Sequence, residues 1–217
     1  MIKGFVSDMD GIVADTEVLH YKAFQRFTKT FGVNLSEEEY AKGIGIGEEE
    51  HARMIKRDFK IPLPLEEILK EIKRLDLEEL GKVENLNEGY VDLLELLKKN
   101  GTKISLATSS SRPVIDIIMG RTEIGKYFVS TFSAHETGSK VLAYAGAVKS
   151  LGLKASECFA LEDSPHGGMA AKQAGLYCVV IPSKYVNGAD FSFADEVHKS
   201  IPEFLRKGKI LKGLAAK

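Results

Sequence analysis

The stretch VSDMDG, residues 6–11, decides how the rest of the sequence is interpreted. It joins the end of a short apolar run, typical of a buried strand, to two aspartates that are one residue apart. Two such charges repel each other by up to about 4 kcal/mol at 4 Å and an effective dielectric constant near 20. A cation or a protonated partner must relieve this repulsion, so the end of this strand is a candidate functional site.

The composition indicates a globular protein with no overall affinity for polyanions. The chain has 217 residues, of which 44% are hydrophobic, enough for one large domain or for one domain that carries an insertion. Lys and Arg total 30 and Asp and Glu total 31, so no net charge favours nucleic acid or an anionic membrane. The sequence contains no apolar run of the ~20 residues that a membrane span needs and no signal-peptide pattern, so we expect a cytoplasmic protein. Cys158 and Cys178 lie in apolar runs and are expected to be buried thiols.

Short apolar runs alternate with helical patterns along most of the chain. Runs typical of strands are Lys3–Ser7, Lys103–Ala107, Tyr127–Phe132, Cys158–Leu161 and Tyr177–Ile181. Helical patterns at residues 89–101 and 141–152 each end at a glycine, and a last amphipathic helix is expected from Lys199 onward. This alternation predicts an α/β fold with a Rossmann-like, doubly wound parallel sheet.

The connection between the first two runs breaks this rhythm. Residues 8–102 lie between them, many more than one crossover helix requires. Amphipathic helical patterns occupy residues 16–32, 48–59 and 64–80 of this stretch. We therefore predict a separate helical domain at residues 15–85, inserted into a core made of residues 1–14 and 86–217, with hinges near Ala14–Thr16 and Asn85–Glu88.

The residues that follow three of the predicted strands can carry chemistry. Ligands of an open parallel sheet bind beyond the carboxyl ends of its strands, where the strand order reverses. The segments at those ends are DMDG (8–11), TSSSR (108–112) and EDSP (162–165). Their four carboxylates need a counter-charge, and hard oxygen ligands of this kind suit Mg²⁺. The Thr108 hydroxyl and the N–H groups at the starts of the following helices suit phosphate oxygens.

Three motifs at these strand ends resemble one known family. They are DMDGIVADTEVLH (8–20), LATSS (106–110) and LEDSPHG (161–167). In content, order and spacing they resemble the motifs of the haloacid dehalogenase superfamily, in the branch that holds β-phosphoglucomutase and sugar-phosphate phosphatases. The resemblance covers nearly the whole chain, and it implies that the helical insertion is a cap domain.

The resemblance also implies a role for each motif residue. Asp8 would attack phosphorus to form an aspartyl phosphate, and Asp10 would be the general acid and then the general base. Thr108 would bind the phosphoryl group. Mg²⁺ would be held by Asp8, the backbone carbonyl of Asp10, Asp163 and Glu162. Further residues expected to bind phosphate or substrate are Gly11, His20 and Ser109.

The third motif of the family departs from its usual form. The family pattern GKPxPD contains a lysine that pairs with the nucleophile, whereas this chain reads ETGSKVLAY at residues 136–144. Lys140 lies at the expected distance before LEDS, so we expect it to be this lysine. The alternative is a surface lysine at the start of a helix.

We expect a Mg²⁺-dependent phosphatase that acts on a small phosphorylated metabolite, such as a sugar phosphate. The mutase of this branch carries an arginine in its cap loop, and the matching stretch Lys42–Glu49 contains none. Arg53, Lys56 or Lys70, from the helices that follow, would have to take its place. A phosphosugar mutase therefore remains the alternative, and a non-catalytic regulatory protein is a further one. A hydrolytic dehalogenase would not need Asp10. The only partner expected is the small substrate, with no nucleic acid or membrane, and the protein is expected to be a monomer.

Overall fold

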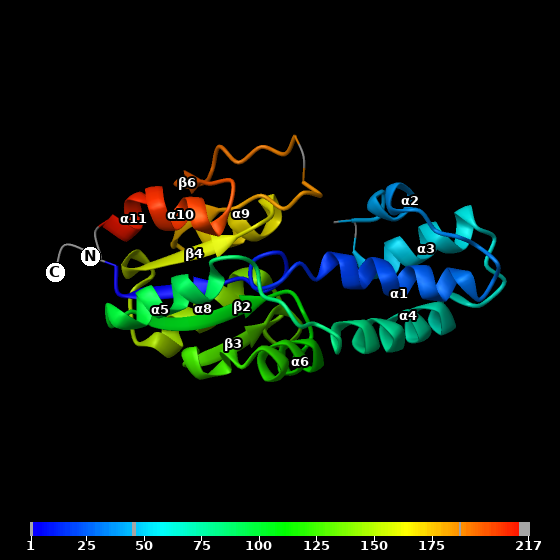
Figure 1. The fold of residues 1–217 in the computed structure, drawn as a ribbon, viewed down its shortest axis with the longest axis horizontal. Coiled ribbons are helices and arrows are strands. Elements are labelled where there is room, and N and C mark those ends of the chain that lie inside the picture. The colour runs from blue at the N-terminus through cyan, green and yellow to red at the C-terminus, as the bar shows by residue number, and fades with distance from the viewer. Residues whose placement is uncertain (1, 45–46, 187, 213–217) are drawn as a thin grey trace. The chain divides into compact units, whose positions relative to one another are not determined.

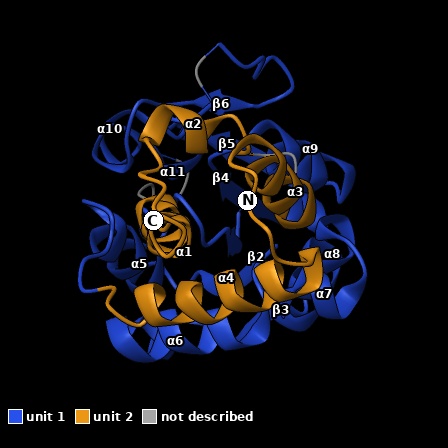
Figure 2. Ribbon diagram, turned by 90° about the vertical axis from the view of Figure 1, so that its right-hand side faces the viewer, with its two compact units in different colours: residues 1–15, 84–217 blue, residues 16–83 orange. Residues whose placement is uncertain are grey.

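The computed structural model describes residues 2–44, 47–186 and 188–212. The chain divides into two compact units, one of residues 1–15 and 84–217 and one of residues 16–83 (Figure 2).

The first unit is built on a six-stranded parallel sheet (Figure 1). Its strands are β1 (Gly4–Ser7), β2 (Lys103–Thr108), β3 (Ser130–Ser133), β4 (Cys158–Glu162), β5 (Tyr177–Val180) and β6 (Glu196–Val197). They lie in the order β3-β2-β1-β4-β5-β6, so the chain switches direction across the sheet at β1. In the register Ser7 is opposite both Leu106 and Leu161, which brings the carboxyl ends of β1, β2 and β4 together. The predicted doubly wound α/β fold is confirmed.

Three details of this unit differ from the sequence prediction. β3 begins at Ser130, because Ile124–Tyr127 forms a 3₁₀ turn, η1. β6 was not predicted, because it has only two residues and is defined by its pairing with β5. The terminal helix is split at Gly208 into α10 (Ile201–Lys207) and α11 (Lys209–Lys212).

Helices cover both faces of the sheet. They are α5 (Tyr90–Lys99), α6 (Arg112–Thr122), α7 (Ala134–Thr137), α8 (Lys140–Leu151), the 3₁₀ turn η2 (Ala155–Glu157), α9 (Pro165–Gln173) and α10. On one face, Val6 and Ala160 belong to the same buried cluster as residues of α8 and α9. On the other face, Phe5 stacks on Phe159 with ring centroids 4.7 Å apart, and Phe159 contacts Phe204 of α10. Alternate strand residues thus serve opposite faces, as the pleat requires. Both cysteines are buried and free, as predicted.

Two serine caps fix the helix starts that follow β3 and β4. The Ser139 hydroxyl accepts from the N–H of Leu142 at the start of α8. The Ser164 hydroxyl accepts from the N–H of Gly167 in α9, whose first residue is Pro165. The sequence predicted this second cap, because serine followed by proline is typical of a helix start.

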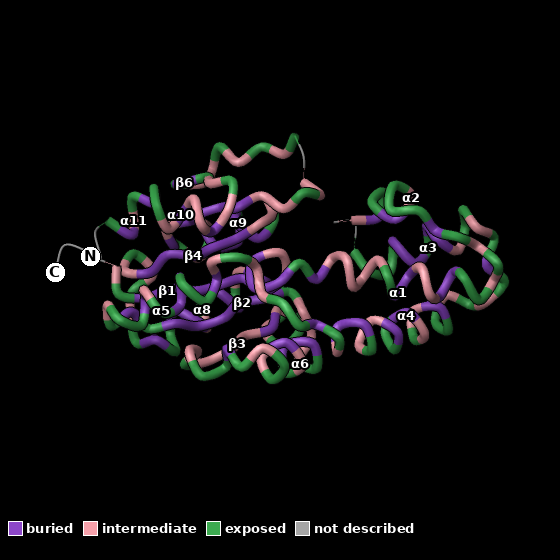
Figure 3. Tube along the Cα trace, viewed as in Figure 1, coloured by how far each residue is buried: buried purple, intermediate pink, exposed green. Residues whose placement is uncertain are grey.

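The second unit contains helices and connecting loops but no strand among its described residues. Its helices are α1 (Glu17–Lys29), α2 (Glu37–Ala41), α3 (Glu48–Asp58) and α4 (Leu65–Leu80). Buried and exposed positions alternate along them, as Figure 3 shows for α4. The buried positions form one apolar cluster that includes Phe24, Phe27, Ile55, Ile68 and Ile72. Each such side chain contributes about 1.5–3 kcal/mol when fully buried.

Asn87 ties together the two points where the chain leaves and re-enters the sheet unit. Its backbone N–H donates to the carbonyl of Val13 at 2.9 Å. Its side-chain amide donates to the carbonyls of Gly11 at 2.7 Å and Ile12 at 3.0 Å. The turn after β1 is therefore held from the far end of the inserted segment.

A search of the described helices finds none that is both long and apolar enough to cross a membrane.

Candidate active site

Asp8 follows the last residue of β1 and is held tightly at the sheet edge. Its backbone N–H donates to the carbonyl of Leu161 at 3.0 Å, and the residue is only 4% exposed. The Ser7 hydroxyl donates to the Asp8 carbonyl at 2.6 Å and accepts from the Tyr90 hydroxyl at 2.8 Å. The Asp8 carboxylate is therefore fixed by its backbone on a rigid strand.

Lys140 is the cation next to Asp8. Its Nζ donates to Asp8 Oδ1 and lies 3.3 Å from Glu162 Oε1. The lysine is the first residue of α8 and is only 7% exposed, with its ammonium group against Asp8 and Glu162. Lys140 is therefore not the surface lysine of the alternative interpretation. It pairs with Asp8 although the prolines and the aspartate of the family pattern are missing.

Two glycines make room for the carboxylates at the end of β4, Glu162 within the strand and Asp163 directly after it. Glu162 is fully buried, and a Cβ on Gly167 would lie 2.2 Å from its Oε2. Asp163 is half-buried, and a Cβ on Gly11 would lie 2.2 Å from its Oδ2. Gly11 also has a φ of +75°, which favours glycine. Backbone therefore approaches both carboxylates more closely than any side chain would permit.

The carboxylates outnumber the cation in this cluster. Asp8, Glu162 and Asp163 each offer an oxygen, and these atoms all lie within 4.8 Å of one another. Burial raises the pKa of Asp8 well above its usual range, and Glu162 raises it further while Lys140 opposes the rise. Burial alone would lower the pKa of Lys140, but Asp8 and Glu162 outweigh it and raise that pKa. The raised pKa of Lys140 reflects the negative charge around it, and a set of hard oxygen donors with excess negative charge fits a divalent cation such as Mg²⁺.

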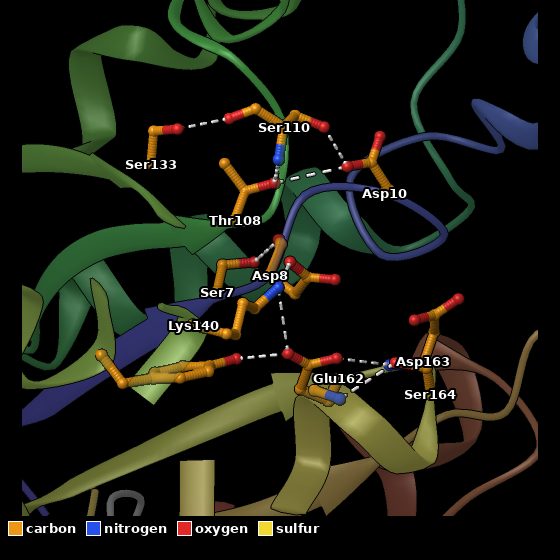
Figure 4. A network of polar contacts seen from close by, with 12 residues as sticks. Ser7, Asp8, Asp10, Thr108, Ser110, Ser133, Lys140, Glu162, Asp163 and Ser164 are labelled. Carbon is orange, nitrogen blue, oxygen red and sulfur yellow. Dashed lines mark hydrogen bonds and ion pairs between the residues drawn. The ribbon is translucent and has the colours of Figure 1, made fainter. Parts of the chain in front are cut away.

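Asp10 lies opposite this cluster and contacts hydroxyl groups from the end of β2 (Figure 4). Its Oδ2 accepts from the Ser110 hydroxyl and, at 3.3 Å, from the Thr108 hydroxyl. The Ser110 N–H donates to the Thr108 oxygen at 3.0 Å, and the Ser133 hydroxyl donates to the Ser110 carbonyl at 2.7 Å. Asp10 is therefore held by hydroxyls at the end of β2, and Ser133 of β3 in turn holds Ser110.

Ser109 was expected to bind phosphate or substrate, whereas it is the neighbouring Ser110 that donates to Asp10. Ser109 is exposed, and Ser110 is half-buried. The run TSSSR (108–112) could have indicated Ser110, because consecutive residues after a strand point in different directions and any of these hydroxyls could face the site. Gly11 was expected to bind phosphate, but its N–H donates to the carbonyl of Ala14 at 3.0 Å within the turn.

The other predicted residues lie in the second unit. His20 Nδ1 is 2.5 Å from Asp76 Oδ1. Arg53 pairs with Glu49, and Lys56 donates to the carbonyl of Ile61 at 3.0 Å. Residues 45–46 of the stretch interpreted as a cap loop lie outside the described residues.

The amino-acid sequence of the chain matches a known family and several of its members. Residues 5–181 match the family model of the haloacid dehalogenase-like hydrolases. Protein CbbY of Cereibacter sphaeroides is 30% identical over 220 residues, which cover 94% of each chain. A phosphorylated carbohydrates phosphatase of Thermotoga maritima is 26% identical over 178 residues, covering 81% of this chain and 82% of that protein.

A solved structure gives the same result. CbbY from Rhodobacter sphaeroides, crystallised in complex with phosphate and, as a mutant, with xylulose-(1,5)bisphosphate, matches with a TM-score of 0.80 and 28% identity. The match covers 94% of this chain and 96% of that one. The chain belongs to the family of haloacid dehalogenase-like hydrolases.

Proposed function

We propose that this protein is a Mg²⁺-dependent phosphatase that hydrolyses small phosphorylated carbohydrates through an aspartyl phosphate. The observation that carries the proposal is the buried contact of Lys140 with Asp8, surrounded by Glu162 and Asp163. Relatives named as a phosphorylated carbohydrates phosphatase and as CbbY with a bound sugar bisphosphate support the substrate class.

Asp8 is the nucleophile in this proposal. Lys140 engages Oδ1, so the other carboxylate oxygen, Oδ2, attacks phosphorus while the bond from phosphorus to the ester oxygen breaks. The ammonium group also offsets charge on the phosphoryl oxygens as they approach a buried carboxylate. The rigid backbone contacts of Asp8 keep the attacking oxygen in place during both half-reactions.

Asp10 moves the proton. It protonates the leaving alcohol oxygen as the ester bond breaks, and its carboxylate then accepts a proton from the water that attacks the aspartyl phosphate. Orthophosphate leaves, and the Asp8 carboxylate is restored. The hydroxyl contacts of Ser110 and Thr108 orient the Asp10 side chain before substrate arrives.

Asp8, Glu162 and Asp163, with the backbone carbonyl of Asp10, would hold the Mg²⁺ ion. When bound, the ion neutralises the repulsion between the phosphate dianion and the nucleophile. Lys140 already lowers the pKa of the buried Asp8, and the positive charge of the ion would act in the same direction.

A phosphate-release assay over a panel of sugar phosphates, with and without Mg²⁺, tests the proposal. We expect release that requires Mg²⁺ and that disappears in Asp8→Asn, with the exposed Asp92→Asn as matched control. Rapid quenching with labelled substrate should trap the phosphoryl group on the wild-type protein. Release by Asp8→Asn at the wild-type rate would refute the mechanism. Isomerisation of a sugar phosphate without phosphate release would instead indicate a mutase.

A further inference from the structure

Tyr144 is a buried polar residue that the proposed reaction leaves without a role. It lies on α8 one helical turn after Lys140, with no measurable exposure. Its hydroxyl donates to Glu162 Oε1 at 2.6 Å, and the Lys140 ammonium lies 5.9 Å from its ring centre. In the stretch SKVLAY it stands at the position where the pattern GKPxPD has aspartate. A tyrosine hydroxyl is therefore built into the network that holds the expected nucleophile.

Two donors share one oxygen of Glu162. Oε1 accepts the Tyr144 hydroxyl at 2.6 Å, while Lys140 Nζ stays 3.3 Å away and bonds Asp8 instead. The other oxygen, Oε2, faces the N–H of Asp163 at 3.3 Å and the backbone of Gly167. Glu162 is fully buried and cannot satisfy Oε1 with bulk water. If the Tyr144 hydroxyl were absent, the lysine would be the donor best placed to satisfy that oxygen.

The choice between two carboxylates matters for Lys140. Asp8 and Glu162 both lie next to the one ammonium group of Lys140, which donates to Asp8 while Glu162 Oε1 stays 3.3 Å away. A neutral donor on Glu162 Oε1 satisfies that oxygen without adding charge. The Lys140 contact with Asp8 is thereby favoured over the contact with Glu162.

We propose that Tyr144 is a positioning residue, whose hydroxyl occupies Glu162 Oε1 and so keeps Lys140 on Asp8. The expected effect on catalysis rests on the proposed function. The position of Lys140 can be measured whether or not the protein turns over a substrate. Without the hydroxyl, Lys140 shifts toward Glu162, and the phosphoryl group loses the cation beside the attacking carboxylate.

Tyr144→Phe removes only the hydroxyl and is the test variant. Tyr177→Phe is the matched control. The Tyr177 hydroxyl donates to Glu196 at 3.0 Å, and this contact joins β5 to β6 and lies outside the candidate site. The first readout is the Nζ resonance of Lys140 in ¹⁵N-lysine-labelled, metal-free protein. The second is the pair kcat and KM for the best sugar phosphate of the panel at saturating Mg²⁺.

We expect Tyr144→Phe to shift the Lys140 resonance and to lower kcat about tenfold with KM within about twofold, because the lost interaction acts at the transition state. Tyr177→Phe should change neither. An unshifted Lys140 resonance, or a kcat within about twofold of wild type, overturns the proposal and leaves the phosphatase assignment intact. A wild-type protein that releases no phosphate refutes the proposed function, while the resonance comparison still decides the position of Lys140.

The wild-type protein provides a second measurement in case Tyr144→Phe does not fold. The Tyr144 hydroxyl proton should give an exchange-protected resonance with a through-space contact to the Lys140 ammonium protons. Failure to find a protected hydroxyl proton at Tyr144 overturns the proposal.

Discussion

Replacing Lys140 by methionine should destabilise the sheet unit strongly. Methionine matches the apolar stem of lysine, but it leaves the carboxylates of Asp8 and Glu162 buried without their ammonium partner. Removing one partner of a buried ion pair costs about 3–5 kcal/mol, against a total stability of about 5–15 kcal/mol for a typical domain. We therefore expect Lys140→Met to lose about a fifth or more of the stability of the protein at neutral pH in the absence of metal.

The pH dependence of this loss follows from Asp8. Its pKa is raised in the folded protein although Lys140 lowers it, so removing Lys140 raises it further. A carboxyl group whose pKa is raised by folding destabilises the protein at a pH above that pKa, and this effect vanishes below the pKa of the unfolded chain. The deficit of Lys140→Met relative to wild type should therefore shrink as the pH falls from 7 toward 4. Mg²⁺ should reduce the deficit at pH 7, because it supplies positive charge to the same carboxylates.

Urea denaturation, followed by circular dichroism at pH 7 and pH 4.5 with and without Mg²⁺, measures both effects. Lys172→Met is the control, because Lys172 pairs with Asp195 at a partly exposed position where an ion pair contributes about 0–1 kcal/mol. If Lys140→Met and Lys172→Met lose equal stability at pH 7, the reasoning that Lys140 is the counter-charge of the buried cluster is wrong.

Three further predictions concern the glycine turn, the metal site and the second unit. Gly11→Ala should lose more stability than Gly101→Ala. Both glycines have φ near +70° (+75° and +70°), but only a Cβ at residue 11 would clash, at 2.2 Å from Asp163 Oδ2. Equal losses in thermal denaturation would show that the clash is relieved. Asp163→Asn should abolish the rise in melting temperature that Mg²⁺ gives the wild type, and a full rise would place the ion elsewhere. Burial lowers the pKa of His51 from 6.5 to about 4, so wild-type stability should fall by up to about 3 kcal/mol between these pH values as the unfolded chain takes up the proton. In His51→Leu this loss of stability at low pH should be missing when urea denaturation is measured across the pH range. Identical pH profiles for the two proteins would show that the pKa of His51 is not lowered by burial.

The parallel sheet was predictable because its central strands are buried on both faces. β1, β2, β4 and β5 are short continuous apolar runs, which is the pattern such strands require. The motif residues at their ends could be identified for the same reason. β6 carries no such pattern, since its buried residue is Glu196, and only its neighbour β5 makes it a strand.

The details of the candidate site depended on side-chain direction, which the sequence does not contain. Ser109 and Ser110 are adjacent and chemically identical, yet only Ser110 donates to Asp10. Tyr144 has the spacing of a core residue in an apolar helix, and its hydrogen bond to Glu162 is visible only once α8 and β4 are placed together. Lys140 and its pairing with Asp8 could be expected from the motif, whereas its second contact, with Glu162, could not.

The three hydrogen bonds of Asn87 join the chain before the inserted segment to the chain after it, so both ends of the insertion are fixed within the sheet unit. Because the two chain ends meet there, the scaffold pays little conformational entropy for whatever lies between them. The insertion is consequently exchangeable: a different helical module, or a short turn, could be grafted between residues 15 and 84 while the carboxyl ends of β1, β2 and β4 keep their geometry. The sheet unit and the inserted segment can then change separately in evolution, because one hydrogen-bonded point of the fold separates them.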